Sequence, residues 1–529
     1  MIKKVIENWL TSTKEREYQL PFCQVLASQG HRVLHVSSHG PGEHGKDIVT
    51  LAPDGVPCAY QLTTGDVGVT QWREYDGKLR ELASIKIRHP SVERTKGWHR
   101  SYFVTNGRIT ADVQQKVDMI NEDHATTSSP LCTIEFDELL GMFATIQGQF
   151  YPTELRDTKR FLELLLADGR EPLCSEAFSV FLTGLLPLQE REVRTTKTQC
   201  TRSLASALLT CCYIGQQYMH ADNHFALIDL WVVFIAHMFA VVERHDLGES
   251  YWHSTYSLAS LSLHSAFAQA IEEIDNRSAD VRSLVEGNGL VDFACFSDRL
   301  LMMVGYLSAY ALSRRISGIT DWSIPALDKL ILVHNKLLFC FTDRHPYGEA
   351  AFPQILCLAH YLESTGRLRE ASVLVGALVR LVTVKGKRDG LPNPYYSMES
   401  CIRHHLGLSP LDEAFAQRSY HLRSLVEWMA RRFWRQFIRS NWREISHVQH
   451  REFVAEEKWG YFLWRCGKGD EMARFPDQTQ SWAQLRRDYG DDELPAVLLT
   501  RLEFLPLFLI VYPHRLTPRL TWKLDEIVR

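Results

Sequence analysis

The first part of the chain alternates between segments with helical spacing of apolar residues and short apolar runs of strand length. Phe22, Val25 and Leu26 fall on one helical face. Gly30 follows the last turn, so residues 15–30 are predicted to form an amphipathic helix with a glycine cap. The pattern that follows predicts strands at 32–36, 45–49, 60–66, 101–107 and 131–136, and helices at 72–82, 110–121 and 137–145.

From about residue 150 onward the chain consists of long segments with helical spacing. No run there alternates with period two, which predicts an all-α region built as a helical array or bundle. Gly148 and Pro152 mark the change, and glycine and proline cluster again at 386–394. We predict domains at 1–148, 149–388 and 389–529, the last separate from the second or continuous with it. The predicted helices lie at 155–167, 175–186, 202–218, 225–242, 257–274, 296–313, 324–341, 353–362, 367–384, 411–439 and 493–511.

The most apolar run, 225–242, has nearly the length of a membrane span. Asp229 and His237 lie within it and would be costly in lipid. We therefore interpret this run as the central buried helix of a soluble protein, with no membrane partner.

Charge and cysteine content restrict the possible functions. A net charge of −4 and a pI near 6.6 give no overall basic field, so any contact with nucleic acid must come from local patches. The 12 cysteines include no Cys-x-x-Cys pair, which favours free thiols in a reducing, cytoplasmic compartment. A phosphate-binding Gly-x-x-x-x-Gly-Lys-(Ser/Thr) loop is absent from the sequence, which argues against ATP hydrolysis.

Candidate chemistry lies in two neighbouring strands joined by the turn Pro53-Asp54-Gly55. Asp47 lies on the first strand, and Gln61 and Thr63 lie two residues apart on the second. Side chains two apart in a strand share a face, so these polar groups are expected to converge. Such a grouping is typical of a site for a hard cation such as Mg²⁺ or Mn²⁺.

The stretches Gly45-Lys46-Asp47-Ile48-Val49 and Tyr60-Gln61-Leu62-Thr63 resemble the core of the PD-(D/E)xK nuclease superfamily, in particular its Mrr-like restriction endonuclease branch. Asp47 falls on the metal-binding aspartate of that family and Gln61 on its Glu/Gln position. Thr63 falls where the family has its lysine. The order helix, three strands, helix, strand, helix, strand over about residues 1–145 is similar to the family core. The resemblance implies a restriction-endonuclease-like α/β domain, with a central mixed sheet flanked by helices.

The resemblance also implies a ligand set for the cation. Asp47 is the first expected ligand, the backbone carbonyl of Leu62 the second, and Gln61 offers a neutral oxygen. The family has a glutamate on its first helix, for which Glu15 and Glu17 are both candidates.

Thr63 cannot supply the positive charge of the family lysine, which orients water and neutralises the phosphate. The charge could come from Lys46 next to Asp47, or from Lys78 on the following helix. Alternatively, the site holds metal and binds DNA without cutting it, or the lysine was altered in this chain alone.

The helical region contains one strongly basic stretch. Arg432, Arg435, Arg439 and Arg443 follow three-to-four spacing and predict one guanidinium stripe beside Trp434. Such a stripe suits a DNA backbone or an acidic protein partner. The alternative is a solvated face paired with nearby glutamates, among them Glu444, Glu452, Glu456 and Glu457.

Together these observations predict a DNA-targeting, metal-dependent endonuclease of a bacterial restriction or antiviral defence system. The helical region is expected to regulate it, and other subunits of a defence complex, or self-association, are expected as partners. The alternative is a catalytically impaired, nuclease-derived subunit or scaffold that binds DNA or a protein partner.

Overall fold

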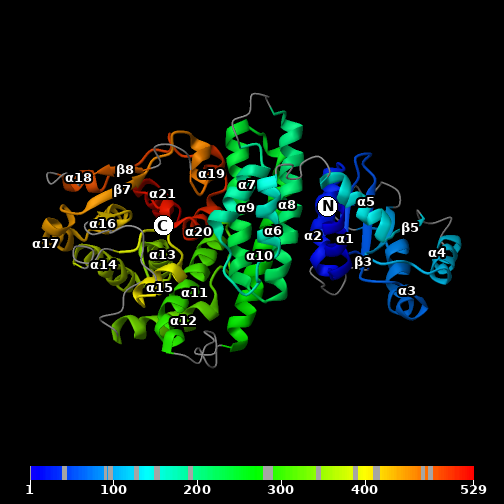
Figure 1. Cartoon of the computed structure of the whole chain (residues 1–529), viewed down its shortest axis with the longest axis horizontal. Helices are drawn as coiled ribbons and strands as arrows, with labels where there is room; N and C mark the ends of the chain where they lie inside the picture. Colours follow the sequence, from blue (N-terminus) through cyan, green and yellow to red (C-terminus); the bar gives the residue numbers. More distant parts are fainter. Residues whose placement is uncertain are drawn as a thin grey trace. The chain divides into compact units, whose positions relative to one another are not determined.

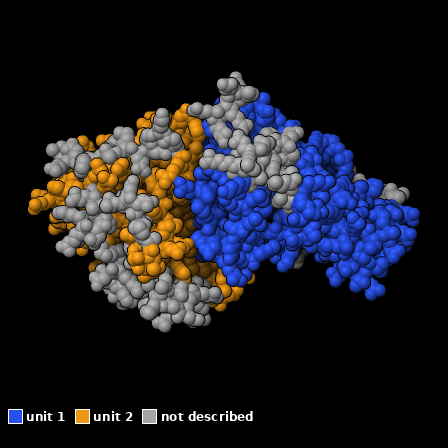
Figure 2. All heavy atoms as spheres, viewed as in Figure 1, with its two compact units in different colours: residues 1–264 blue, residues 265–529 orange. Residues whose placement is uncertain are grey.

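The computed structural model (Figure 1) divides into two compact units, residues 1–264 and 265–529, coloured separately in Figure 2. The predicted domain boundaries at 148/149 and 388/389 lie outside the described residues, so the three-domain division stays a prediction. The structure describes residues 2–37, 45–87, 92, 99–123, 130–147, 155–188, 195–277, 290–340, 347–384, 391–408, 418–465, 471–474 and 480–528.

The first unit contains a five-stranded mixed sheet in the order β1-β2-β3-β4-β5. The first three strands pair antiparallel, whereas β3, β4 and β5 are parallel. Each parallel connection passes through a helix, as parallel pairing requires. The predicted mixed sheet flanked by helices is therefore confirmed. The strands are β1 (Arg32–Val36), β2 (Ile48–Leu51), β3 (Pro57–Thr63), β4 (Arg100–Thr105) and β5 (Leu131–Ile134).

Helices cover both faces of this sheet. On one face, Ala59 and Phe103 pack with Trp72 and Leu79 of α3 and with residues of α4. On the other face, the ring of Tyr60 packs 5.6 Å from that of Phe22 in α2. The side chains alternate because neighbouring strand residues point to opposite faces. The helices of this part are α1 (Ile2–Ser12), α2 (Glu15–Ser28), α3 (Val69–Ser84), α4 (Ala111–Asp123) and α5 (Phe136–Gln147).

A layer of long helices completes the first unit. Helix α8 packs against α2 and α5, and Trp9 of α1 lies between Phe143 and Tyr213, with ring centroids 5.4 and 4.8 Å away. The sheet and these helices therefore share one core. The helices are α6 (Leu155–Leu165), α7 (Ser175–Leu185), α8 (Lys197–His220), α9 (His224–His245), the 3₁₀ turn η1 (Glu249–Tyr251) and α10 (His253–Arg277), which continues into the second unit.

Helix α9 contains the apolar run noted in the sequence. Among the described residues it is the one helix whose length and composition would allow it to cross a membrane, and 89% of its most apolar window is buried. Its His237 bonds the carbonyl of Val233 and the hydroxyl of Ser179 within the core. The interpretation as a buried core helix is confirmed.

The second unit is mainly helical, around the pair α11 and α13. Gly305 lets these helices approach closely, because a Cβ there would lie 2.4 Å from the Cβ of Gln354. Its helices are α11 (Leu290–Ile316), α12 (Pro325–Cys340), α13 (Phe352–Ser364), α14 (Leu368–Val384), α15 (Met398–His405), α16 (Leu422–Arg431), α17 (Arg435–Ile445), α18 (Trp482–Leu485), α19 (Ala496–Thr500), α20 (Leu505–Val511) and α21 (Pro518–Val528). The 3₁₀ turns are η3 (Glu349–Ala351), η4 (Lys458–Phe462), η5 (Leu502–Phe504) and η6 (Pro513–Arg515).

The prediction that everything after residue 150 is all-α is wrong in one place. A small sheet joins β6 (Arg418–Ser419), β7 (Gln449–Phe453) and β8 (Glu471–Arg474). These strands are short and rich in charged residues, so they show no alternation of apolar and polar positions.

Two of the predicted long helices are broken. Residues 411–417 lie outside the described residues, and the rest of the predicted helix 411–439 forms β6, α16 and the start of α17. The predicted helix 493–511 forms α19, η5 and α20. Helix α16 ends in a Schellman motif, in which Trp434 N donates to Met429 O (3.2 Å) and Phe433 N to Ala430 O (3.1 Å). Phe433 takes the left-handed conformation (φ 66°) that glycine usually adopts there, so the sequence carries no stop signal.

Candidate functional site

Asp47 lies just before β2, on a loop held against α3. Gly45 precedes it with φ 68°, and a Cβ at that glycine would lie 2.4 Å from the carbonyl oxygen of Lys78. Only glycine fits this approach. Asp47 N donates to Tyr60 O (2.8 Å) and Ser37 N to Asp47 O (2.7 Å), so the backbone of Asp47 is fixed between β1 and β3.

The side chains of Asp47 and Gln61 meet, as their spacing predicts. Gln61 Nε2 donates to Asp47 Oδ2 (2.5 Å) and to the carbonyl oxygen of Leu62 (3.0 Å). Leu62 N donates to the same carboxylate oxygen (2.7 Å). Both side chains are buried, with 6% and 2% of each residue exposed. The amide of Gln61 therefore bridges two oxygens, those of Asp47 and Leu62, that are the predicted ligands of a cation.

Gln61 presents its nitrogen to Asp47, whereas its predicted role is to offer an oxygen to the cation. Rotating the Gln61 amide by 180° would exchange its nitrogen and its oxygen. The oxygen would then lie where the nitrogen now lies. An NH₂ group between two acceptors makes the contacts that a cation would make there. The donor set of carboxylate and carbonyl oxygens is the one that Mg²⁺ and Mn²⁺ prefer, so the residues fit such an ion.

The structure distinguishes between the two candidate glutamates. Glu17 Oε2 accepts from Lys14 N (2.9 Å) at the start of α2, and Glu17 Oε1 lies 3.7 Å from His220 Nε2. Glu15 instead lies close enough to Asp47 for the charge of Asp47 to act on it. Burial, and then the charge of Asp47, raise the pKa of Glu15 to about 7, although Lys78 and Arg16 act in the opposite direction. Glu15 is therefore the better candidate for the helical carboxylate of the site.

Two further residues of α2 reach the site. Gln19 Nε2 donates to the carbonyl oxygen of Asp47 (3.2 Å), and Tyr18 Oη donates to that of Thr63 (2.6 Å). Burial raises the pKa of Tyr18 well above its ordinary value, so this hydroxyl keeps its proton. The role of Tyr18 was missed in the sequence, although Glu15, Tyr18 and Gln19 have the i, i+3, i+4 spacing of one helical face.

Thr63 lies where the resemblance places the family lysine, and its residue is only 2% exposed. It follows Gln61 by two positions in the regular strand β3, so both side chains share the same face. Its hydroxyl carries no charge, so the positive charge that the resemblance implies would have to come from another element.

Lys46 and Lys78 differ as substitutes for that lysine. Lys46 is buried, which lowers its pKa to about 8, and the carboxylate that opposes this shift is Glu81. The carboxylate whose charge acts on Lys46 is therefore on α3. Lys78 is exposed, its Nζ lies 5.5 Å from the ring centroid of Tyr75, and its charge lowers the pKa of Glu15. Lys78 is the better candidate.

The raised pKa of Glu15 predicts a pH dependence of stability. Between the ordinary pKa of 4.5 and about 7 the folded protein holds a proton at Glu15 that the unfolded chain has released. The free energy of unfolding should therefore fall as the pH rises through this window. In urea denaturation at pH 5, 6, 7 and 8, Glu15→Gln should show a smaller fall than the parent. Glu349, whose pKa burial also raises to about 7, contributes equally to both proteins. Identical pH profiles of parent and variant would contradict the assignment.

The predicted stripe of four arginines is wrong for Arg432. The side chain of Arg432 is buried at the end of α16, with its guanidinium 3.5 Å from the ring centroid of Trp428. Arg435, Arg439 and Arg443 lie on α17 at intervals of four residues and are exposed. Trp434 is half-buried at the start of α17. The surface stripe therefore has three members, all on one helix.

A second cluster of possible metal ligands lies next to Arg432. His360 and Glu363 of α13 and Asp525 of α21 have ligand atoms within 4.8 Å of one another. Arg432 Nη2 lies 2.5 Å from Asp525 Oδ1 and also contacts Glu363, while Arg431 Nε lies 2.9 Å from Asp525 Oδ2. These guanidinium groups neutralise the carboxylates. The cluster is an ion-pair network that ties α21 to α13 and α16.

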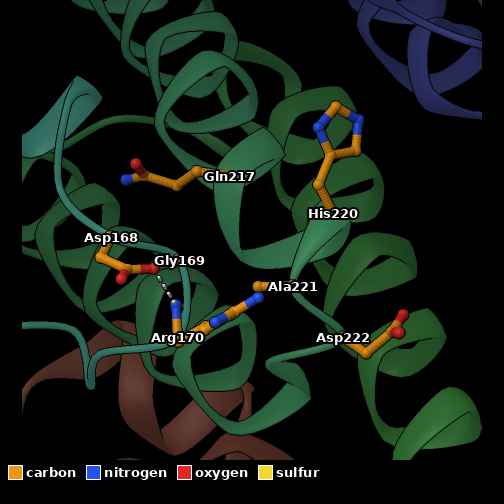
Figure 3. Close-up of a pocket in the computed structure, with 7 residues that line it drawn as sticks. All are labelled: Asp168, Gly169, Arg170, Gln217, His220, Ala221 and Asp222. Atoms are coloured by element: carbon orange, nitrogen blue, oxygen red, sulfur yellow. Dashed lines mark hydrogen bonds between the residues drawn. The ribbon is translucent and has the colours of Figure 1, made fainter.

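A hollow of about 490 Å³ lies at the C-terminal end of α8 (Figure 3). Figure 3 shows Gln217 and His220 pointing in different directions, so its polar groups do not converge. Gln217 Nε2 is bonded to Leu164 O (2.6 Å), and we assign the hollow no ligand. The lining residues are Asp168, Gly169, Arg170, Gln217, His220, Ala221 and Asp222.

Comparisons of the chain with protein-family models, with curated proteins and with solved structures found no match.

Proposed function

We propose that the five-stranded domain is a divalent-cation-dependent nuclease that hydrolyses phosphodiester bonds in DNA. The observation that carries the proposal is the meeting of Asp47, Gln61 and the carbonyl of Leu62 at one point, with Glu15 in the same electrostatic surroundings. The resemblance of the same residues to the PD-(D/E)xK motif supports it independently of the geometry.

The charges of the site support a cation there. Two carboxylates in a partly buried place repel one another, which is why Asp47 raises the pKa of Glu15. An ion held by Asp47, Glu15 and the Leu62 carbonyl would remove this repulsion. Bound there, Mg²⁺ or Mn²⁺ would supply stabilisation of charge on the scissile phosphate and lower the pKa of an attacking water.

The protein residues have separate roles in this proposal. Asp47 is fixed by its bonds to Leu62 N and Gln61, so its carboxylate is oriented before a ligand arrives. Tyr18 supports the end of β3 through the carbonyl of Thr63. Lys78, on the exposed face of α3, supplies the positive charge for the phosphate that Thr63 lacks.

The second candidate function is a catalytically impaired, nuclease-derived subunit that binds DNA or a protein partner. The buried hydroxyl of Thr63 at the lysine position favours it. In either case we propose a cytoplasmic role in bacterial restriction or antiviral defence, with the helical region controlling the nuclease domain. This role is taken from the resemblance alone.

The proposal is tested by incubating supercoiled plasmid and a labelled linear duplex with the protein in Mg²⁺, Mn²⁺, Ca²⁺ or EDTA. Cleavage is expected with Mg²⁺ or Mn²⁺ and none with EDTA. Lys78→Gln should reduce the rate roughly tenfold, which is about 1.4 kcal/mol of transition-state stabilisation. Lys116→Gln on α4 removes the same charge from the same domain and should leave the rate unchanged. Cleavage that persists in EDTA would overturn the proposal, and a cation-bound protein that never cuts would support the impaired alternative.

A further inference from the structure

Arginine and aromatic side chains alternate on one surface of the second unit, around α16, α17 and α18. The guanidinium carbon of Arg486 lies 4.5 Å from the ring centroid of Phe433, and that of Arg435 lies 5.9 Å from Trp482. Trp434 and Phe437 are in ring contact at 6.3 Å. Helix α16 contacts both α17 and α18, which lie together at one edge of the unit in Figure 1. We call this set the arginine–aromatic surface.

Phe433 is the unusual member of the arginine–aromatic surface. It is 69% exposed and has a φ of 66°, a conformation that costs a bulky residue energy. Glycines hold the equivalent left-handed positions at the ends of α2 and α13, Gly30 and Gly366. Burial does not stabilise this side chain and its backbone conformation is strained, and strained residues of this kind are found at functional sites.

The charge of the arginine–aromatic surface is strongly positive. Its exposed cations are Arg380, Arg435, Arg439, Arg443, Arg486 and Arg487. Glu444 and Asp488 are exposed acids on or next to the same elements. Within the part of the chain that the structure describes, no carboxylate pairs with Arg435, Arg439 or Arg443. Two of the glutamates expected to neutralise them are engaged elsewhere, Glu452 with Arg423 and Glu457 with Trp459.

We propose that the arginine–aromatic surface binds single-stranded nucleic acid. Guanidinium groups suit phosphates, and an exposed ring offers a base a stacking platform that needs no particular sequence. A duplex keeps its bases stacked on each other, so a ring such as Phe433 would find no free base face. The proposal goes beyond cleavage and requires no activity at Asp47.

The test is fluorescence anisotropy with a labelled 30-nucleotide oligo(dT), an RNA oligonucleotide of the same length and a duplex, all in EDTA so that no strand is cut. Arg435→Glu/Arg439→Glu should weaken binding of single strands at least tenfold. The slope of log K against log salt should become shallower by about 0.7 for each lost phosphate contact. Arg369→Glu/Arg403→Glu changes the charge of the same unit equally, at exposed positions on α14 and α15, and should bind as the parent does.

The Phe433→Gly variant distinguishes a loss of affinity for single strands from a loss of stability. Glycine relieves the strained backbone, so the melting temperature should rise by about 2 °C. The same variant should bind single strands roughly tenfold more weakly, because a stacked base is lost. A loss of binding with a gain of stability cannot come from unfolding.

Four results would overturn this inference. The first is a parent protein that binds no single strand. The second is an Arg435→Glu/Arg439→Glu variant that binds as the control does. The third is a Phe433→Gly variant with unchanged affinity. The fourth is a parent protein with equal affinity for duplex and single strand. Binding of an acidic protein in place of nucleic acid falls under the first result. DNA cleavage by the site at Asp47 is measured in a separate experiment. Failure of the cleavage proposal therefore leaves the single-strand-binding proposal testable, and the reverse also holds.

Discussion

Asp47→Asn should reduce cation-dependent DNA cleavage by about three orders of magnitude. Asparagine has nearly the shape of aspartate and keeps an oxygen that can accept from Leu62 N, but it carries no charge to hold Mg²⁺ or Mn²⁺. The stabilisation that a cation gives to a phosphoryl oxygen is worth several kcal/mol, and each 1.36 kcal/mol is a factor of about ten in rate. The measurement is the initial rate of plasmid nicking at saturating Mg²⁺.

The control for Asp47→Asn is Asp54→Asn. Asp54 lies on the turn between β2 and β3, is exposed, and pairs with Arg100 at 2.6 Å. Its replacement makes the same charge change in the same sheet and should leave cleavage within a factor of two of the parent, since a surface pair contributes little. Thermal melting of both variants shows that each is folded. A folded Asp47→Asn protein that cuts at the parent rate would place the chemistry elsewhere.

Thr63→Lys should raise the cleavage rate about 100-fold. The new ammonium group would project from the same face of β3 as Gln61, where the resemblance places the family lysine. A cation beside the scissile phosphate is commonly worth several kcal/mol in the transition state. Nearby carboxylates at Asp47 and Glu15 would offset part of the cost of burying the lysine.

Thr64→Lys is the matched control, because Thr64 is the next residue and is exposed. It should leave the rate unchanged. In the Thr63→Lys background, Lys78→Gln should lower the cleavage rate less than it does in the parent. Both amines would supply positive charge for the phosphate, so the loss of one matters less when the other is present. A silent parent with an active Thr63→Lys variant would establish the impaired alternative. Equal rates of parent and Thr63→Lys would show that positive charge does not limit the reaction.

The strands that place Asp47 and Gln61 next to each other could be predicted because the signals are local. Gly45, the turn at Asp54-Gly55 and the apolar run of β3 are short-range features, and cross-strand neighbours follow from them. The choice between Glu15 and Glu17 could not be predicted, since it depends on Glu17 bonding the backbone of Lys14. A lysine at the helix start does not suggest a cap, so this contact gave no sequence signal.

The surface of the second unit was less predictable because the residues that contact one another there are distant in sequence. Arg432 is drawn inward by Asp525, 93 residues later, and by Glu363, 69 residues earlier. The break at Phe433 has no glycine or proline to announce it. Arg486 and Trp482 join the arginine–aromatic surface only through tertiary packing, which periodicity along one helix cannot reveal.

We propose that Asp47 and Glu15 hold a divalent cation, and a Mn²⁺ titration followed by electron paramagnetic resonance measures this binding without relying on cleavage. At pH 7 the parent should bind Mn²⁺ at one site that Mg²⁺ competes for. Asp47→Asn should lose this site, Glu15→Gln should weaken it about tenfold or more, and Glu17→Gln and Asp54→Asn should retain it. A parent that binds no Mn²⁺, or a Glu17→Gln variant that loses binding as fully as Glu15→Gln, would contradict the account.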